Sequence, residues 1–177
     1  MKLYLVRHGR TEWNVNRLIQ GRIDVPLNEV GVKDAKRNAK KLKDVQFDIC
    51  YCSPLQRARE TANIIVDNKC DIVICDLITE RDVGRLEGTT VNNYKARNFW
   101  DINKVNNEDG VESSRTLLNR TKEFLDFLKK KYTDEKVLIV SHSGTIKAMH
   151  YNIIGYDDKT NFNSFYCRHD DIHEYDI

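Results

Sequence analysis

Short apolar runs alternate with amphipathic stretches along most of the chain. Residues 2–6 and 137–140 are bulky and continuously apolar, as expected for strands buried on both faces. Two further strand-like runs occur at 47–52 and 71–75. Helical periodicity fills the intervals between these runs. The alternation predicts a three-layer α/β fold, in which helices cover both faces of a mainly parallel sheet.

Four stretches repeat their apolar residues at the spacing of helices that bury one face. They cover residues 31–43, 54–66, 117–128 and 145–154. Ser53 is a favourable N-cap for the second of them, and Pro54, which follows it, suits a first helical position. Near the end of the chain, residues 164–168 and 172–175 predict a hairpin.

Residues 1–177 are expected to form a single domain, because no repeat, low-complexity tract or linker interrupts them. With 40% hydrophobic and 32% charged residues, a chain of this length can bury a core without a metal or disulfide. Residues 89–110 are the exception to the clear patterning. Their aromatic residues, Tyr94, Phe99 and Trp100, predict a lid or insertion that packs over another part of the fold.

Charge and cysteine content exclude several classes of protein. A formal net charge of +2 is too small to indicate a nucleic-acid partner. No run has the length of a membrane span and no signal peptide is recognisable, so we expect a cytoplasmic protein without a membrane partner. The five cysteines lack a CxxC pair, which predicts buried, reduced thiols and no zinc site.

Polar residues that carry chemistry follow two of the predicted strands directly. Arg7 and His8 follow residues 2–6, and His142 follows residues 137–140. Open α/β sheets bind ligands at the carboxyl ends of their strands. If the two strands are neighbours, both imidazoles lie in one crevice at that edge. The alternative is a structural role, in which each histidine only hydrogen-bonds to the backbone nearby.

Arg57 falls in the opening turn of the helix predicted from residue 54. A cation at the positive end of a helix dipole is unfavourable unless an anion lies beside it. Arg7, His8, Arg57 and His142 together therefore predict a receptor for a phosphoryl group, which guanidinium forks bind well. One histidine can attack phosphorus, while the other donates a hydrogen bond to the phosphoryl oxygens.

A reaction that breaks a phosphate ester also needs an acid for the departing alcohol. Glu80 follows the strand-like run 71–75 most closely and is the first candidate. Asp82 and Glu87 lie in the same loop and are alternatives. A solvated carboxylate paired with Arg81 or Arg85 would also explain the loop.

These residues occur within four motifs that resemble the histidine phosphatase superfamily, also called the phosphoglycerate mutase-like family. The resemblance covers almost the whole chain. The motifs are Arg7-His8-Gly9-x-Thr11-x-x-Asn14, Gln20-Gly21 with Asp24-x-Pro26-Leu27-Asn28 and Gly31, Ser53-Pro54-Leu55-x-Arg57-Ala58-x-x-Thr61-Ala62, and Val140-Ser141-His142. Residues 109–113 are similar to the family's Gly-Gly-Glu-Ser segment, with Val111 in place of a glycine, and are expected to start a helix near the site.

The resemblance implies a role for each matched residue. His8 is implied to be the nucleophile that becomes phosphohistidine, and Glu80 the general acid. The implied phosphate-binding residues are Arg7, Asn14, Gln20, Gly21, Arg57, His142 and Ser143. Ser143 stands where a glycine often follows the second histidine. No metal or other cofactor is implied, because guanidinium and imidazole groups neutralise the phosphate.

The short segment from Glu80 to His142 favours a phosphatase over a mutase. Mutases of the family carry a long insertion there, whose basic residues hold the substrate carboxylate. In this chain Lys95, Arg97 and Arg115 are the candidates for that contact. We therefore expect hydrolysis of small phosphorylated metabolites, with sugar-phosphate and α-ribazole phosphatases as more specific alternatives.

Two other functions stay open at this point. A cofactor-dependent phosphoglycerate mutase would use 2,3-bisphosphoglycerate. A catalytically inactive phosphate-binding scaffold is disfavoured, because His8 and Glu80 are both present. The sequence indicates neither the physiological substrate nor whether the protein is a monomer or a homodimer.

Overall fold

The computed structural model describes residues 1–92, 100–103 and 110–177, and within them five strands form one sheet. The strand order is β3-β2-β4-β1-β5. β5 runs antiparallel to β1, whereas the other neighbouring pairs are parallel. The bounds are β1 Lys2–Arg7, β2 Ile49–Cys52, β3 Ile72–Ile74, β4 Lys136–Ser141 and β5 Ile172–Asp176. The predicted mainly parallel sheet is thereby confirmed.

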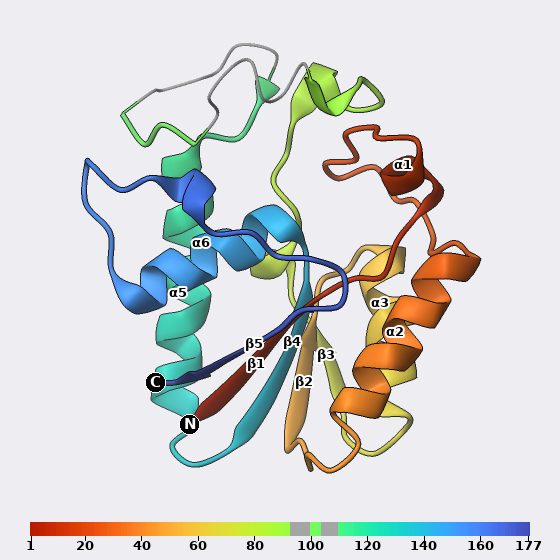
Figure 1. Ribbon diagram of the computed structural model, residues 1–177. Helices are drawn as coiled ribbons and strands as arrows, with labels where there is room; N and C mark the ends of the chain where they lie inside the picture. The colour runs from red at the N-terminus through yellow and green to blue at the C-terminus, as the bar shows by residue number, and fades with distance from the viewer. Residues whose placement is uncertain (93–99, 104–109) are drawn as a thin grey trace.

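Helices cover both faces of this sheet (Figure 1). α2 (Glu29–Lys41) and α3 (Gln56–Val66) lie on one side, and α5 (Ser114–Lys131) and α6 (Ser143–Ile154) on the other. The short helix α1 (Glu12–Val15) follows β1 at the carboxyl edge of the sheet. Three short 3₁₀ turns complete the described elements: η1 (Asp76–Ile78), η2 (Gly84–Leu86) and η4 (Phe162–Ser164).

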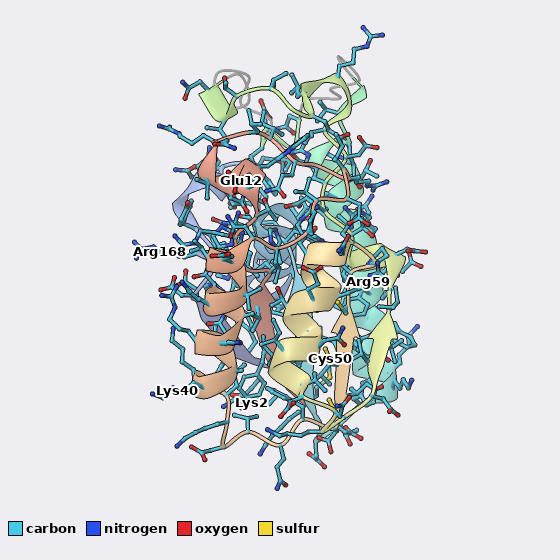
Figure 2. The ribbon with its side chains drawn as sticks, turned by 90° about the vertical axis from the view of Figure 1, so that its right-hand side faces the viewer. Lys2, Glu12, Lys40, Cys50, Arg59 and Arg168 are labelled. Carbon is cyan, nitrogen blue, oxygen red and sulfur yellow. The ribbon has the colours of Figure 1, made fainter. Side chains whose placement is uncertain are left out.

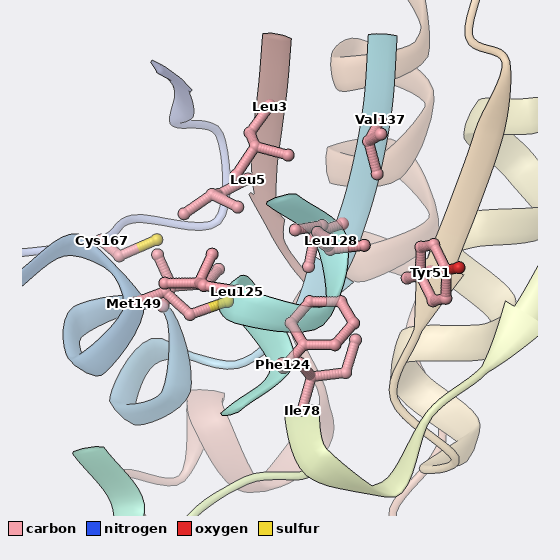
Figure 3. Packing of buried hydrophobic residues seen from close by; sticks show 12 residues of the cluster. Leu3, Leu5, Tyr51, Ile78, Phe124, Leu125, Leu128, Val137, Met149 and Cys167 are labelled. Carbon is pink, nitrogen blue, oxygen red and sulfur yellow. The ribbon is translucent and has the colours of Figure 1, made fainter. Parts of the chain in front are cut away.

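The core has two halves because successive side chains of a strand point to opposite faces. Leu3 and Leu5 of β1 belong to the cluster that contains Phe124 of α5 (Figure 3). Tyr4 and Val6 belong to the cluster on the side of α2 and α3. Both faces are covered, which explains the continuous apolar run of β1. Charged side chains, such as Lys40 and Arg59, lie at the outer surface of the helices (Figure 2).

The end of the chain differs from the predicted hairpin. Residues 165–171 form no strand, and β5 pairs with β1, from Lys2 opposite Asp176 to Val6 opposite Ile172. The open edge of β1 offers a longer set of hydrogen-bond partners than a short local hairpin would. The segment before β5 crosses the carboxyl end of β1 (Figure 1). There the carbonyl of Cys167 accepts a hydrogen bond from Arg7 Nη1 at 2.9 Å.

Other features of the sequence analysis stand as follows. All five cysteines are free thiols, and Cys50, Cys52 and Cys167 are buried. Much of the predicted lid, at 93–99 and 104–109, lies outside the described residues, including Tyr94 and Phe99. Within the described part of the chain, none of the helices has the length and apolar character needed to cross a membrane.

Candidate active site

The two strands that end in histidines are direct neighbours in the sheet. Arg7 of β1 lies opposite Ser141 of β4, so His8 and His142 leave the sheet side by side. The backbone N–H of His8 donates to the carbonyl of Ser141 at 2.9 Å. The two imidazole rings have their centroids 5.0 Å apart. The register of the parallel pair therefore brings together two residues that are distant in sequence.

His8 is buried, with 3% of its surface exposed, and its ring is oriented by the backbone. Its Nδ1 lies 2.7 Å from the carbonyl oxygen of Gly9, which can only accept, so Nδ1 carries the proton. Burial and the nearby cations Arg57 and Arg7 hold the pKa of His8 well below its usual range. Its Nε2 is consequently an unprotonated nitrogen with a free lone pair.

His142 is fully buried beside His8, and its ring is held from the end of β2. Its Nε2 lies 2.7 Å from the hydroxyl oxygen of Ser53. Burial and the charges of Arg57 and Arg7 lower the pKa of His142, so this ring is also neutral. Ser53 is therefore not the N-cap predicted for α3. The helix begins at Gln56, after Leu55, without a side-chain cap.

Arg57 is the second residue of α3 and is almost completely buried, at 1% exposure. Its Nη1 donates to the carbonyl of Ile23 and its Nη2 to that of Gly21, each at 2.8 Å. Burial lowers the pKa of Arg57 to about 10, which still leaves the group positively charged at neutral pH. The arginine thus fixes the loop after α1 against the start of α3, as a cation in the opening turn.

Three buried nitrogen atoms around His8 lack a partner within the part of the chain that the structure describes. They are Nε of Arg7, Nε of Arg57 and Nδ1 of His142. Buried polar groups in native proteins are nearly always hydrogen-bonded, so a missing partner calls for an explanation. A bound oxyanion would accept from all three.

A cavity of about 630 Å³ opens in front of His8. This volume is typical of a site for a small molecule. Arg7, Arg57 and Glu80 line it, together with the predicted phosphate-binding residues Asn14, Gln20, Gly21 and Ser143. His142 is fully buried next to His8 and is not among the lining residues.

Glu80 is held against the first turn of α6. Its carboxylate accepts from the backbone N–H of Arg81 at 2.8 Å and of Gly144 at 3.2 Å, and from the hydroxyl of Thr145 at 3.3 Å. Position 144 has no room for a larger residue, because a Cβ there would lie 2.6 Å from Glu80 Oε1. These contacts fix the carboxylate at the rim of the cavity.

The two alternative acids point elsewhere. Asp82 accepts from the backbone N–H of Gly84, and Glu87 from that of Arg22 at 2.7 Å. Neither lines the cavity. Among the three carboxylates of this loop, only Glu80 lines the cavity that His8 also lines.

A buried ion pair between Arg120 and Glu112 supports the loop that carries Glu80. Burial alone would raise the pKa of Glu112, but hydrogen bonds and charge from Arg120 lower it. Arg120 also donates to the carbonyls of Leu77 and Glu80. Ser113 caps α5 by accepting from Thr116 N–H, as expected for a helix start near the site. Asp109, the first residue of this motif, lies outside the described residues.

Several residues that line the cavity were not anticipated from the motifs. They include Arg81, Trp100, Lys147, Asn163 and Tyr166. Lys147 stands four residues after Ser143 in α6, a spacing that puts both on the same side of a helix. That spacing is the feature of the sequence that could have indicated Lys147 as a residue of the site. Lys95, Arg97 and Arg115 were expected as candidates to contact a substrate carboxylate. Arg115 does not line the cavity, and Lys95 and Arg97 lie outside the described residues.

The potential ligands of a metal ion are scattered over the fold. Within residues 1–92, 100–103 and 110–177, no group of three or more histidine, cysteine, aspartate or glutamate side chains is arranged to hold a metal ion.

Known proteins share both the sequence pattern and the fold of this chain. The family model of the histidine phosphatase superfamily (branch 1) matches residues 3–171. The chain is 36% identical to the uncharacterized phosphatase PhoE of Bacillus subtilis, over 86% of this chain and 77% of the relative. It is 34% identical to phosphoserine phosphatase 1 of Hydrogenobacter thermophilus, over 94% of this chain and 82% of the relative.

A solved structure shows the same fold over the whole length. The α-ribazole phosphatase of Shigella flexneri superposes with a TM-score of 0.87 at 28% identity, covering 100% of this chain and 91% of that one. The three-layer fold with a mainly parallel sheet is thereby confirmed.

Proposed function

This chain belongs to the histidine phosphatase superfamily, and we propose that it hydrolyses a small phosphomonoester through a phosphohistidine formed on His8. The observation that carries this proposal is the neutral His8 ring, whose protonated Nδ1 is bound to Gly9. The free Nε2 is then the nucleophile. It lies among three buried donors that lack a partner in the described residues, as a phosphoryl site requires.

The first chemical step transfers the phosphoryl group to the enzyme. The lone pair of His8 Nε2 forms the bond to phosphorus as the ester P–O bond breaks. The bonding electrons leave with the alcohol oxygen, which takes a proton from Glu80. Arg7 Nε, Arg57 Nε and His142 Nδ1 donate to the phosphoryl oxygens and stabilise their charge.

The second step returns the enzyme to its starting state. The Glu80 carboxylate, oriented by Arg81, Gly144 and Thr145, accepts a proton from a water molecule as the water oxygen attacks phosphorus. The P–N bond breaks, its electrons return to His8 Nε2, and inorganic phosphate leaves. Arg7 and Arg57 supply positive charge and His142 supplies a hydrogen bond to the phosphate, so the proposal includes no metal.

Trapping the phosphoenzyme tests this mechanism. After incubation with a ³²P-labelled phosphomonoester in EDTA, the wild-type protein should carry an acid-labile, base-stable label. His8→Ala should carry none, whereas His173→Gln, on the edge strand β5, should keep it. Undiminished label in His8→Ala would contradict the assignment of the nucleophile. Loss of label in EDTA, restored by a divalent ion, would contradict the metal-free mechanism.

Hydrolysis and mutase activity are separated by the products. With 3-phosphoglycerate as substrate, we expect free phosphate to accumulate, with or without 2,3-bisphosphoglycerate. The assay scores phosphate and the 2-phosphoglycerate isomer together. Isomer formation that is faster than phosphate release and depends on the bisphosphate would favour the mutase alternative.

A further inference from the structure

Lys147 is a half-buried amine on the wall of the proposed catalytic cavity. Its Nζ lies 4.8 Å from the centre of the Trp100 ring. Across the described residues, no hydrogen bond or ion pair holds this amine. A partly desolvated ammonium group gains from a ring face, but much less than from a hydrogen-bonded anion.

The aromatic ring beside Lys147 is itself fixed in place. Trp100 is 9% exposed and stacks on Phe162, with centroids 5.9 Å apart and planes 13° from parallel. The guanidinium carbon of Arg81 lies 5.2 Å from the same ring. Two cations therefore lie close to one ring, in the same cavity that Arg7 and Arg57 line. In the proposed mechanism Arg7 and Arg57 bind the phosphoryl group, which leaves Lys147 for a second anionic group of the substrate.

The helix sets the separation between the two ends of the cavity. Ser143 opens α6, where it lines the cavity next to the phosphoryl site. Lys147 follows one turn later, about 6 Å along the axis. A substrate of three or four atoms between its phosphate and a second charged group spans such an interval.

We propose that Lys147 determines substrate specificity by binding a carboxylate that the phosphomonoester carries close to its phosphate. The preferred substrate is then a phosphorylated hydroxy or amino acid. This inference rests on the proposed function, and it adds the class of substrate. The Trp100 ring lies 4.8 Å from the Lys147 amine, a distance at which a ring face attracts a cation, and so helps to hold the amine at the cavity.

A matched pair of substrates tests the inference. 3-Phosphoglycerate and glycerol 3-phosphate differ in one group, because the second carries an uncharged hydroxymethyl group in place of the carboxylate. Wild-type kcat/KM should favour 3-phosphoglycerate by about tenfold or more, as expected for a charge-assisted hydrogen bond. Lys147→Met should remove this preference and leave glycerol 3-phosphate within about twofold. Lys147→Arg should retain most of it.

The pH dependence of the same ratio gives a second readout. Burial lowers the pKa of Lys147 to about 8, with the charge of Glu80 opposing this shift and that of Arg81 adding to it. Cys167, from the segment before β5, also raises the pKa of Lys147. The wild-type preference should therefore decline between pH 7 and about pH 9, as the amine loses its proton. In Lys147→Arg it should stay constant, because arginine keeps its charge.

Each outcome separates this inference from the proposed function. p-Nitrophenyl phosphate has no carboxylate, so its hydrolysis reports the phosphoryl site alone. If wild type hydrolyses it but shows no preference within the pair, the inference fails and the proposed function stands. An equal loss of kcat/KM for both substrates in Lys147→Met, in a protein with an unchanged melting temperature, would also overturn the inference. If no ester is hydrolysed, the proposed function itself fails.

Discussion

At the scale of single residues, the proposed mechanism depends on the position of Glu80. Its carboxylate is bound by two backbone N–H groups and one hydroxyl, and it faces the same cavity as His8. In the proposed mechanism this group donates a proton, and its hydrogen bonds fix the direction of that transfer. The leaving oxygen of the substrate then has to lie in that direction.

Glu80→Gln should slow hydrolysis in proportion to how much the leaving group needs a proton. Glutamine keeps the shape but has no acidic proton, so alkyl phosphates should lose about 10²- to 10⁴-fold in kcat. p-Nitrophenyl phosphate, whose phenolate leaves without help, should lose much less from the first step. Single-turnover measurement of phosphoenzyme formation separates that step from hydrolysis.

The neighbouring carboxylates provide matched controls for this change. Asp82→Asn and Glu87→Gln alter the same loop but not the cavity wall. Both should act on alkyl and aryl esters equally and weakly. A leaving-group dependence that appears in one of them and not in Glu80→Gln would transfer the role of acid to that residue.

At the scale of elements, two glycines let α2 pack against the loop that follows β1. A Cβ on Gly31 would lie 1.9 Å from the carbonyl oxygen of Arg10. A Cβ on Gly9 would lie 2.2 Å from the carbonyl oxygen of Gly31. Backbone therefore meets backbone at this point, directly beside His8. Asp34 of α2 adds an ion pair to Arg10 across the same junction.

Gly31→Ala should destabilise the protein, although alanine is the better helix former. The gain in helix propensity is about 1 kcal/mol. Displacing the backbone of Arg10 costs more than that, since overpacking in tight contacts costs about 1–3 kcal/mol and here the neighbour is rigid. Urea unfolding should show a net loss of about 1 kcal/mol or more.

A helix-surface variant gives the comparison for Gly31→Ala. Lys36→Ala lies on the exposed side of α2 and should change stability by no more than about 0.5 kcal/mol. If Gly31→Ala is as stable as wild type and equally active, the close packing of α2 on the loop is not required.

The elements also show where sequence patterns lose their power. Strands such as β1 and β4 are recognisable because both of their faces are buried, which leaves a continuous apolar run. The start of α3 was placed at residue 54, because Ser53 resembles a cap. In the fold its hydroxyl is used by His142, a partner from a distant strand. Local pattern cannot reveal such a competing tertiary contact.

At the scale of the whole molecule, the strand-end residues of the cavity were predictable and the surroundings of Trp100 were not. Arg7, His8 and His142 stand at strand ends, so sheet topology alone brings them together. Trp100 and Lys147 meet only through the packing of a long connection against α6. Their sequence neighbourhoods carry no pattern that specifies this contact. The residues that we propose to select the substrate could therefore be recognised only in the structure.

Buried histidines make the stability of the whole fold sensitive to mild acid. Burial, as the largest cause, lowers the pKa of His8 and His142 well below the usual 6.5 and that of His169 to about 4. Between pH 6.5 and about 4 the unfolded chain therefore binds protons that the folded chain does not. Stability falls with decreasing pH in this window, by about 1.4 kcal/mol per pH unit for each such histidine.

Urea unfolding at pH 7, 6 and 5.5 should show this decline. His169→Gln keeps a donor for the carbonyl of His8 but cannot titrate. The slope of the unfolding free energy against pH should therefore fall by about the contribution of one histidine. Arginine partners lower the pKa values of Asp34 and Glu112 despite burial. These two carboxylates therefore change the stability of the fold only below about pH 4. A stability that is constant from pH 7 to pH 5.5 would contradict neutral buried histidines.

The segment before β5 ties the first strand of the molecule to residues made far later. Cys167 accepts from Arg7, 160 positions earlier, and His169 donates to the carbonyl of His8. On the ribosome, β1 emerges long before these partners exist. A nascent chain that has not yet exposed residue 169 thus lacks the contacts that hold both residues in place. The proposed phosphatase activity should accordingly begin only after translation has passed that point.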